Sequence, residues 1–401
     1  MPTTRESLLT KLNTRLNLVG PSDILAFNAE IAKLPDMVNL TLGEPDFNTP
    51  EHVKQAAIAS IANDESHYAA SNGTLSLREA AANFLATKYN LDYDANTELI
   101  VTIGATEAIY TALASVLNAG DKVIIPTPIF PLYIPITLVN GGTPVFVNTT
   151  ANGFVLSPEM LEAAIAEHGD AIKAVVLNFP SNPTGVTYSA ADLQALAAVL
   201  EKHDIFVISD EIYSELTYEA KHVSMAQYLP AQTILINGVS KSHAMTGYRI
   251  GIMAAPAAIT QQLGKIHQFT ITTAVNAAMA AAEEAFKHGM DDAQPMKIEY
   301  QKRRDYVYDQ LLQLGFEVAK PAGAFYLFAK IPAGLNQISM EFARDLATKN
   351  HLAIIPGGSF GPGGEGYIRI SYAASMTQLT AAMQRLTAYV TENQKVVIAN
   401  D

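Results

Sequence analysis

Residues 98–117 read ELIVTIGATEAIYTALASVL, an apolar stretch whose periodicity changes at Gly104. Residues 98–103 form a short apolar run that is typical of a buried strand, and residues 105–117 repeat apolar side chains at helical spacing. The glycine between them permits a sharp turn from strand directly into helix. This stretch therefore predicts one strand–helix unit of a parallel sheet.

The same alternation continues to about residue 253. Helical patterns, such as the amphipathic segment 190–202, separate short runs rich in Val and Ile. Nearly continuous apolar strands that alternate with helices indicate an α/β fold with a mostly parallel sheet covered on both faces. Ligands of such sheets bind beyond the carboxyl ends of the strands. The further predicted strands cover residues 123–125, 144–147, 174–177, 205–208, 234–236 and 250–253.

The pattern changes after about residue 290. This part of the chain predicts a smaller α+β unit, and the residues before position 48 are too few to form a domain of their own. We therefore predict a large domain of residues 48–289 and a small domain formed by residues 1–47 together with 290–401. The predicted elements of the small domain are helices at 297–314, near 338–348 and from 376, and strands at 325–328, 353–355 and 367–370.

Composition excludes several classes of function. The 401 residues include 39 Asp and Glu against 26 Lys and Arg, a net charge of −13, so the chain lacks the basic face that a nucleic-acid partner needs. The absence of cysteine excludes disulfides, thiolate catalysis and cysteine-based metal sites. The N-terminus has no secretory pattern, and no apolar run approaches the roughly 20 residues of a membrane helix. We expect a soluble, cytoplasmic protein without a membrane partner.

Residues 240–251, SKSHAMTGYRIG, follow one of the predicted strands. Lys241 lies among small and polar residues and is a candidate nucleophilic amine. Arg249, in a Gly-x-Arg-x-Gly setting, offers a planar fork of donors for a phosphate. Most Lys and Arg residues are solvated surface charges, so the pair needs partners elsewhere in the chain. With such partners, it indicates a cofactor held covalently at one end and by its phosphate at the other.

Three other polar segments follow predicted strands at the same edge of the sheet. Asp210 is either a helix N-cap or an acid that points into the ligand crevice. Asn182 lies in a loop with two prolines, which is either an ordinary turn or a device that holds its amide in a fixed direction. Residues 104–106 open a helix, so their free N–H groups and the Thr106 hydroxyl form either a plain helix start or a phosphate site.

Arg369 lies within the predicted strand 367–370, between apolar residues. A charge there is costly unless it meets an anion, which is either an intramolecular carboxylate or a substrate carboxylate held bidentately. Residues 361–366 match G-x-G-x-x-G, but a strand follows instead of a helix, so we reject a dinucleotide site. The nine histidines show no metal-binding spacing, and we predict no metal site.

Six motifs, taken in order, resemble those of the class I and II aminotransferases, which are fold-type I enzymes dependent on pyridoxal 5′-phosphate. The resemblance extends from about residue 40 to the last helix. It implies a large domain with a seven-stranded, mostly parallel sheet between helices and a smaller α+β domain. The motifs are Tyr68, Gly104-Ala105-Thr106, Ser181–Gly185, Asp210–Tyr213, Ser240-Lys241 with Arg249, and Tyr367–Tyr372.

The resemblance implies a role for each candidate residue. Lys241 binds the cofactor covalently and later moves the substrate's proton, while Asp210 keeps the pyridine nitrogen protonated. Tyr213 and Asn182 hydrogen-bond the cofactor's 3′-oxygen, and the ring of Phe130 stacks on the cofactor. The phosphate is held by residues of one subunit and, across a homodimer with shared active sites, by a tyrosine of the other. These phosphate-binding residues are Gly104, Ala105, Thr106, Ser240 and Arg249, with Tyr68 from the neighbouring subunit.

The resemblance implies the substrate's α-carboxylate contacts but not its side chain. Arg369 clamps the α-carboxylate, with Asn182 and the backbone of Gly43 beside it. Many members of the family carry Trp where this chain has Phe130, and some aspartate-specific relatives carry a basic residue near Thr106. The chain most resembles the bacterial branch of aromatic and N-acetyl-diaminopimelate aminotransferases.

We expect an enzyme of amino acid metabolism that moves an amino group from an aromatic or bulky apolar L-amino acid to 2-oxoglutarate by a ping-pong mechanism. Its substrates are amino acids and 2-oxo acids. The alternatives are an N-acetyl-LL-diaminopimelate aminotransferase of lysine biosynthesis, a pyridoxal-phosphate-dependent C–S β-lyase, and a non-enzymatic regulator that binds the same cofactor. The aromatic candidates for the substrate pocket are Phe27, Tyr68, Phe130 and Phe360.

Overall fold

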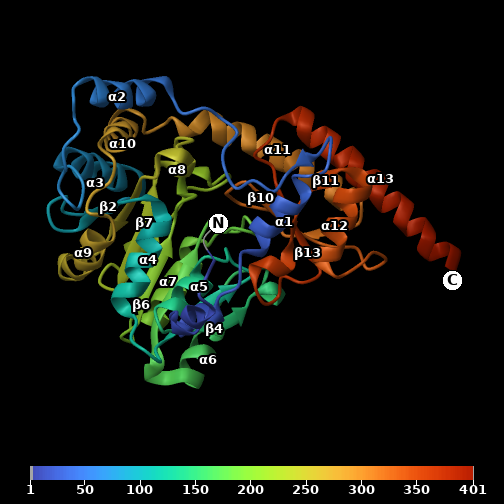
Figure 1. Ribbon diagram of the computed structural model, residues 1–401, viewed down its shortest axis with the longest axis horizontal. Helices are drawn as coiled ribbons and strands as arrows, with labels where there is room; N and C mark the ends of the chain where they lie inside the picture. Colours follow the sequence, from blue (N-terminus) through green and yellow to red (C-terminus); the bar gives the residue numbers. More distant parts are fainter. Residues whose placement is uncertain (1–2, 401) are drawn as a thin grey trace.

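A seven-stranded sheet organises the larger part of the molecule (Figure 1). The computed structural model describes residues 3–400, with side chains as far as residue 393. The strand order is β2-β8-β7-β6-β5-β3-β4, and β8 alone runs antiparallel to its neighbours in this sheet. The expected mostly parallel α/β sheet is thereby confirmed. The strands are β2 (Leu99–Thr102), β3 (Lys122–Thr127), β4 (Thr143–Asn148), β5 (Ile172–Asn178), β6 (Phe206–Asp210), β7 (Thr233–Gly238) and β8 (Gly251–Ala254).

Helices bury both faces of this sheet, as the unbroken apolar strands require. In β5, Val175 packs with α6 and α7 on one face, and the adjacent Val176 packs with α4, α5 and α9 on the other. Farther along the first face, α3 and α10 pack against β2, β7 and β8. The helices are α2 (Glu51–Ala62), α3 (Leu75–Tyr89), α4 (Gly104–Val116), α5 (Tyr133–Val139), α6 (Pro158–His168), α7 (Ala190–Leu200), α8 (Val239–Ser242), α9 (Ala257–Ile271) and α10 (Asn276–His288).

A four-stranded sheet, in the order β12-β13-β10-β9, forms the core of the smaller part with three helices. The predicted strand at 353–355 divides into two short strands, because β11 pairs with β1 and β12 pairs with β13. The elements are β1 (Val38–Asn39), β9 (Glu317–Val318), β10 (Tyr326–Lys330), β11 (Leu352–Ala353), β12 (Ile355–Pro356), β13 (Tyr367–Ser371), α11 (Ala293–Gln313), α12 (Ser339–Asn350) and α13 (Met376–Asn400).

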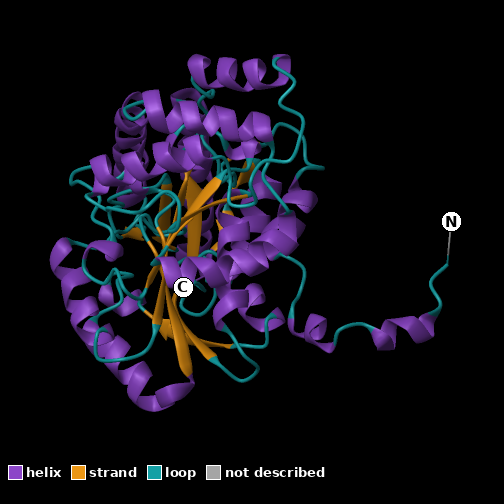
Figure 2. Ribbon diagram, turned by 90° about the vertical axis from the view of Figure 1, so that its left-hand side faces the viewer, coloured by secondary structure: helices purple, strands orange, loops and turns teal. Residues whose placement is uncertain are grey.

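The N-terminal segment has two different parts. Helix α1 (Asp23–Ile31) buries Phe27 and Ile31 in the hydrophobic cluster of the smaller sheet. Before it, residues 6–18 form two short 3₁₀ helices whose leucines are exposed. The first extends away from the body (Figure 2), and the second lies against α5, where Nη1 of Arg15 donates to the carbonyl oxygen of Val139 at 3.3 Å. We keep the division at residues 48 and 289 as a proposal, which the cluster that joins residues 27–40 to 296–390 supports.

The topology brings several chain segments to one edge of the large sheet. Strands β5 and β6 end side by side, with Asn178 opposite Asp210, and Asp210 also lies opposite Ile236 of β7. The turn after β2 opens α4 at the same edge, because β2 and β7 both pair antiparallel with β8. Within residues 3–400, no helix is both long and apolar enough to cross a membrane.

Candidate active site

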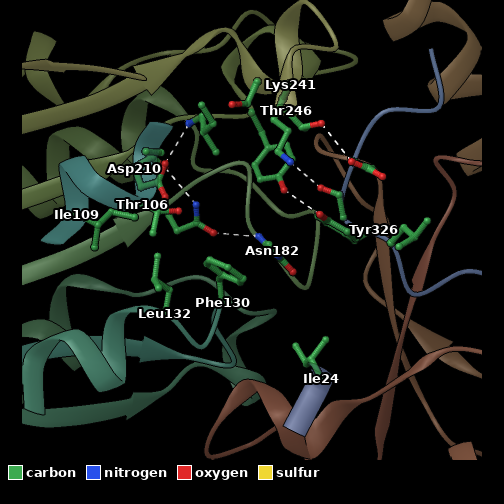
Figure 3. Close-up of a pocket in the computed structure, with 18 of the residues that line it drawn as sticks. Ile24, Thr106, Ile109, Phe130, Leu132, Asn182, Asp210, Lys241, Thr246 and Tyr326 are labelled. Atoms are coloured by element: carbon green, nitrogen blue, oxygen red, sulfur yellow. Dashed lines mark hydrogen bonds between the residues drawn. The ribbon is translucent and has the colours of Figure 1, made fainter. Parts of the chain in front are cut away.

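A cavity of about 430 Å³ lies between the carboxyl edge of the large sheet and the smaller sheet. Figure 3 shows Lys241, Asp210 and Asn182 around it. Of the residues predicted from the sequence to bind the cofactor or the substrate's carboxylate, all but Gly104 and Tyr68 line this cavity; the pocket candidates Phe27 and Phe360 do not line it. The residues brought together are Gly43, Ala105, Thr106, Phe130, Asn182, Asp210, Tyr213, Ser240, Lys241, Arg249 and Arg369.

Lys241 presents its amine to the cavity from the short helix α8, which follows β7 directly. Its Nζ donates a hydrogen bond of 2.6 Å to the carbonyl oxygen of Gly43. Burial, with Arg249 and Arg369 nearby, lowers the pKa of Lys241 to about 8, although Glu44 and Asp210 act in the opposite direction. A substantial fraction of this amine is therefore neutral near pH 8, the form that attacks a carbonyl.

Asp210 ends β6 and is 3% exposed. Its Oδ2 accepts a hydrogen bond of 2.6 Å from the hydroxyl of Tyr133, and its Oδ1 accepts one from the backbone N–H of Ile212. Burial raises the pKa of Asp210 to about 6, although these hydrogen bonds and Lys241 oppose the rise. A buried carboxylate without a cationic contact suits a positively charged group placed in the cavity.

The start of α4 forms a cradle for an anion. Gly104 has a φ of +69°, and a Cβ at this position would lie 2.4 Å from Nη2 of Arg249. Because Gly104 has no side chain, the guanidinium of Arg249 can approach the first turn of the helix. Gly104 itself does not line the cavity. The free N–H groups of Ala105 and Thr106 and the Ser240 side chain line the same region, which fits a phosphate.

Arg369 is 3% exposed, so its positive charge is buried. Its Nη1 donates to Oδ1 of Asn182 at 3.0 Å and its Nη2 to the carbonyl oxygen of Thr41 at 2.6 Å, while its Nε has no partner. No carboxylate of the described side chains forms a salt bridge with it. The alternative of an intramolecular salt bridge is therefore not what the structure shows. Because arginine only donates, the bond also fixes the amide of Asn182 with its oxygen toward Arg369.

Sequence reasoning missed two tyrosines of the site. Tyr133, three residues after Phe130, donates to Asp210. The hydroxyl of Tyr326 lies 2.8 Å from that of Tyr213, and the guanidinium carbon of Arg369 lies 4.5 Å from the Tyr326 ring centroid. The only sequence signal for Tyr326 was its place in an apolar predicted strand, which is equally typical of a core residue.

Gly43 has a visible reason to lack a side chain. A Cβ there would lie 2.8 Å from the hydroxyl oxygen of Tyr326. The backbone of Gly43 can therefore lie against both Tyr326 and the Lys241 amine.

Three of the predicted aromatic pocket residues do not line this cavity. Phe27, in α1, and Phe360 are buried in the cluster of the smaller sheet, although the ring centroid of Phe360 lies 5.2 Å from the guanidinium carbon of Arg369. Tyr68 is 86% exposed and lies beside the start of α10. Among the described residues, no group of three or more His, Asp or Glu side chains could hold a metal ion.

The raised pKa of Asp210 predicts a pH-dependent stability. A carboxyl whose folded-state pKa of about 6 exceeds its ordinary value of 3.8 stabilises the fold fully only below the ordinary value. That contribution is lost as the pH rises through 6. We therefore expect Asp210→Asn, without added ligand, to raise the free energy of unfolding by about 2–3 kcal/mol at pH 7.5. The gain should shrink as the pH falls from 6 toward 4.

Urea unfolding at several pH values measures this effect. Asp204→Asn, at an exposed carboxyl before the same strand, is the matched control and should change stability little at any pH. A ligand-free Asp210→Asn protein less stable than the parent at pH 7.5 would contradict the proposed burial effect.

Comparison with known proteins identifies the family. The family model described as aminotransferase class I and II matches residues 35–386. A probable N-acetyl-LL-diaminopimelate aminotransferase of Bacillus subtilis (strain 168) is 44% identical, over 96% of this chain and 97% of the relative. An aspartate aminotransferase of Pyrococcus abyssi (strain GE5 / Orsay) is 37% identical, over 96% and 99% of the two chains.

The fold agrees with that comparison. The crystal structure of an aromatic aminotransferase from Pyrococcus horikoshii OT3 superposes with a TM-score of 0.87 at 35% identity, covering 95% of this chain and 98% of the other. Members of this family use pyridoxal 5′-phosphate, whose aldehyde, ring and phosphate suit the amine, buried carboxylate and anion cradle described above. The chain belongs to the class I and II aminotransferases and is a pyridoxal-phosphate-dependent enzyme that acts on amino and 2-oxo acids.

Proposed function

We propose that this aminotransferase takes its amino group from an aromatic or bulky apolar L-amino acid and gives it to 2-oxoglutarate by a ping-pong mechanism. The observation that carries the proposal is an apolar wall of Ile24, Phe130 and Leu132 on one side of the active-site cavity. The same three residues also line an adjoining, mainly apolar cavity of about 510 Å³ against residues 18–25. A large apolar side chain finds more buried contact there than a small or charged one.

The cofactor's contacts are part of the proposal. When bound, pyridoxal phosphate supplies an aldehyde that takes up the amino group and a ring that accepts electrons from the substrate. Lys241 would hold the aldehyde end, and its Nζ would accept the proton that leaves the substrate's Cα. Asp210, held by Tyr133, would keep a proton on the cofactor's ring nitrogen, and the cradle at Gly104 and Arg249 would hold the phosphate.

The remaining residues orient ring and substrate. The NH₂ group of Asn182 is directed away from Arg369, so it can donate to the cofactor's 3′-oxygen together with the Tyr213 hydroxyl. Arg369, which has an unpartnered Nε and no carboxylate contact, is the proposed clamp for the substrate's α-carboxylate. Gly43 offers backbone to that carboxylate, and Phe130 stacks on the cofactor ring.

A second candidate is transamination of N-acetyl-LL-diaminopimelate. The 44% identical relative from Bacillus subtilis, named as a probable aminotransferase of that compound, favours it. Its donor carries an amide and a second carboxylate on the side chain, which would have to lie against the apolar wall or leave the cavity.

A panel of amino donors with 2-oxoglutarate tests the proposed substrate class. We expect the highest kcat/KM for phenylalanine, tyrosine or leucine, well above aspartate and N-acetyl-LL-diaminopimelate. Leu132→Ala should lower kcat/KM for phenylalanine roughly tenfold, because buried apolar contact is lost, and should leave alanine as donor almost unaffected. A preference for N-acetyl-LL-diaminopimelate would overturn the proposal in favour of the second candidate, and pyruvate with ammonia from a thioether substrate would indicate a C–S lyase.

We also propose a homodimer with shared active sites. Tyr68 is 86% exposed and lines a surface depression together with Val275, which is 66% exposed. Exposed aromatic and apolar side chains in such a group are typical of an interface. Tyr68 is the residue proposed to reach the phosphate in the second subunit.

Hybrid dimers test this sharing. Tyr68→Phe should weaken the binding of pyridoxal phosphate, since a hydroxyl contact to the phosphate is lost. A hybrid of one Tyr68→Phe chain and one Lys241→Ala chain has one intact lysine. That site should regain the parent affinity, measured by titrating cofactor absorbance, because its Tyr68 comes from the Lys241→Ala chain. If the site keeps the weakened affinity, Tyr68 acts within its own subunit and the sharing is wrong.

A further inference from the structure

A buried histidine lies behind the phosphate cradle, outside the cavity. His267 belongs to α9, and its side chain is 1% exposed. Its Nδ1 lies 3.1 Å from Oε1 of Glu107, in α4, and its Nε2 lies 2.8 Å from the carbonyl oxygen of Ser71. Helix α9, helix α4 and the segment that follows Tyr68 therefore meet at one imidazole.

The two contacts determine the charge of the imidazole. A neutral imidazole has one N–H donor and one acceptor nitrogen, yet a carboxylate oxygen and a carbonyl oxygen face the two nitrogens of His267. Both contacts are satisfied only when both nitrogens carry hydrogen. The hydroxyl of Thr111 and the backbone N–H of Ile103 also donate to Glu107, so both of its carboxyl oxygens act as acceptors.

The electrostatic balance agrees with a charged ring. Burial lowers the pKa of His267, but the hydrogen bond and charge of Glu107, with the Ser71 carbonyl, outweigh it, and the net pKa lies above the ordinary value of 6.5. Glu107 is the charged partner of this imidazole within the described part of the chain.

This ion pair touches two parts of the proposed phosphate site. Glu107 accepts from the N–H of Ile103, the residue directly before the Gly104 turn. Ser71 lies three residues after Tyr68, in a segment that also contacts the large sheet through the bond from Val101 N to Asn72 O. His267 thus connects the two: it contacts the Gly104 turn through Glu107 and the segment after Tyr68 through Ser71.

We propose that His267 is a positioning residue, an imidazolium ion that joins the Gly104 phosphate turn to the Tyr68 segment and holds both in the geometry that binds phosphate. The inference rests on the proposed phosphate role of the Gly104 turn and Arg249. It assigns to His267 no contact with cofactor or substrate.

The charge of His267 can be observed directly. The holoenzyme, with ¹⁵N-labelled histidine, gives long-range ¹H–¹⁵N spectra in which an imidazolium and the two neutral tautomers differ. The His267 signals are those that disappear in His267→Gln. We expect both ring nitrogens to be protonated at pH 7.5. A single-proton pattern at that pH would overturn the inference.

The positioning role is tested by comparing two ligands of the apoenzyme, pyridoxal phosphate and pyridoxal, which lacks the phosphate. His267→Gln should weaken the affinity for pyridoxal phosphate roughly tenfold and change the affinity for pyridoxal by less than about twofold, because only the phosphate binds at the Gly104 turn. Glu107→Gln, which removes the charge facing the imidazole and keeps one side-chain acceptor oxygen, should also weaken the binding of pyridoxal phosphate alone, and it serves as the test if the first variant folds poorly. Equal weakening of both ligands, or of neither, would contradict the positioning role.

Two further variants complete the experiment. His52 also lies between two acceptors, 2.8 Å from Glu284 and 2.8 Å from Asp292, but away from the cavity, so His52→Gln is the matched control and should affect neither ligand. Arg249→Ala should weaken the binding of pyridoxal phosphate and leave the binding of pyridoxal unchanged. If Arg249→Ala has no effect, the proposed phosphate site itself is wrong. If Arg249→Ala weakens the binding and His267→Gln does not, only the inference about His267 is wrong.

Discussion

The site depends on charged groups kept out of water without charged partners of their own. Asp210 and Arg369 are each 3% exposed, and neither forms a salt bridge with a described side chain. Such groups cost several kcal/mol unless other interactions replace their hydration. Here hydrogen bonds from Tyr133 to Asp210, and from Arg369 to Asn182 and Thr41, replace part of it. The part of the lost hydration that these hydrogen bonds do not replace favours a ligand with a cationic ring nitrogen, an anionic phosphate and a carboxylate.

The two sheets supply these groups from opposite sides. Strands β5, β6 and β7 end side by side and bring Asn182, Asp210 and Lys241 to one edge. The smaller sheet adds Arg369 from β13 and Tyr326 from β10, which lie on the same face of an antiparallel pair. Neither sheet alone has the complete set. The segment of Gly43 joins the two sources. Gly43 accepts a hydrogen bond from the Lys241 amine, and the carbonyl oxygens of Leu40 and Thr41, just before it, accept from Ser371 and Arg369 of β13.

Sequence patterns predict the fold and most of the cavity for a physical reason. Parallel strands put their carboxyl ends at one edge, so polar residues that directly follow apolar runs, such as Asp210, are expected to meet. Contacts between distant segments leave no such signal. Tyr133 reaches Asp210 across 77 positions, and His267 reaches Glu107 across 160. The family's layout predicts Phe27 and Phe360 in the pocket, but Phe27 is buried in the core, and Phe360 is buried beside Arg369 without lining the cavity.

Lys241 is the residue proposed to hold the cofactor, and mapping the covalent bond tests that assignment most directly. Holoenzyme is treated with borohydride, which makes the linkage between pyridoxal phosphate and an amine permanent, then digested and examined by mass spectrometry. The desolvated amine at the cavity predicts the added mass on the peptide with Lys241 and on no other lysine. Stoichiometric modification of a different lysine, or no modification of holoenzyme, would contradict the role of Lys241.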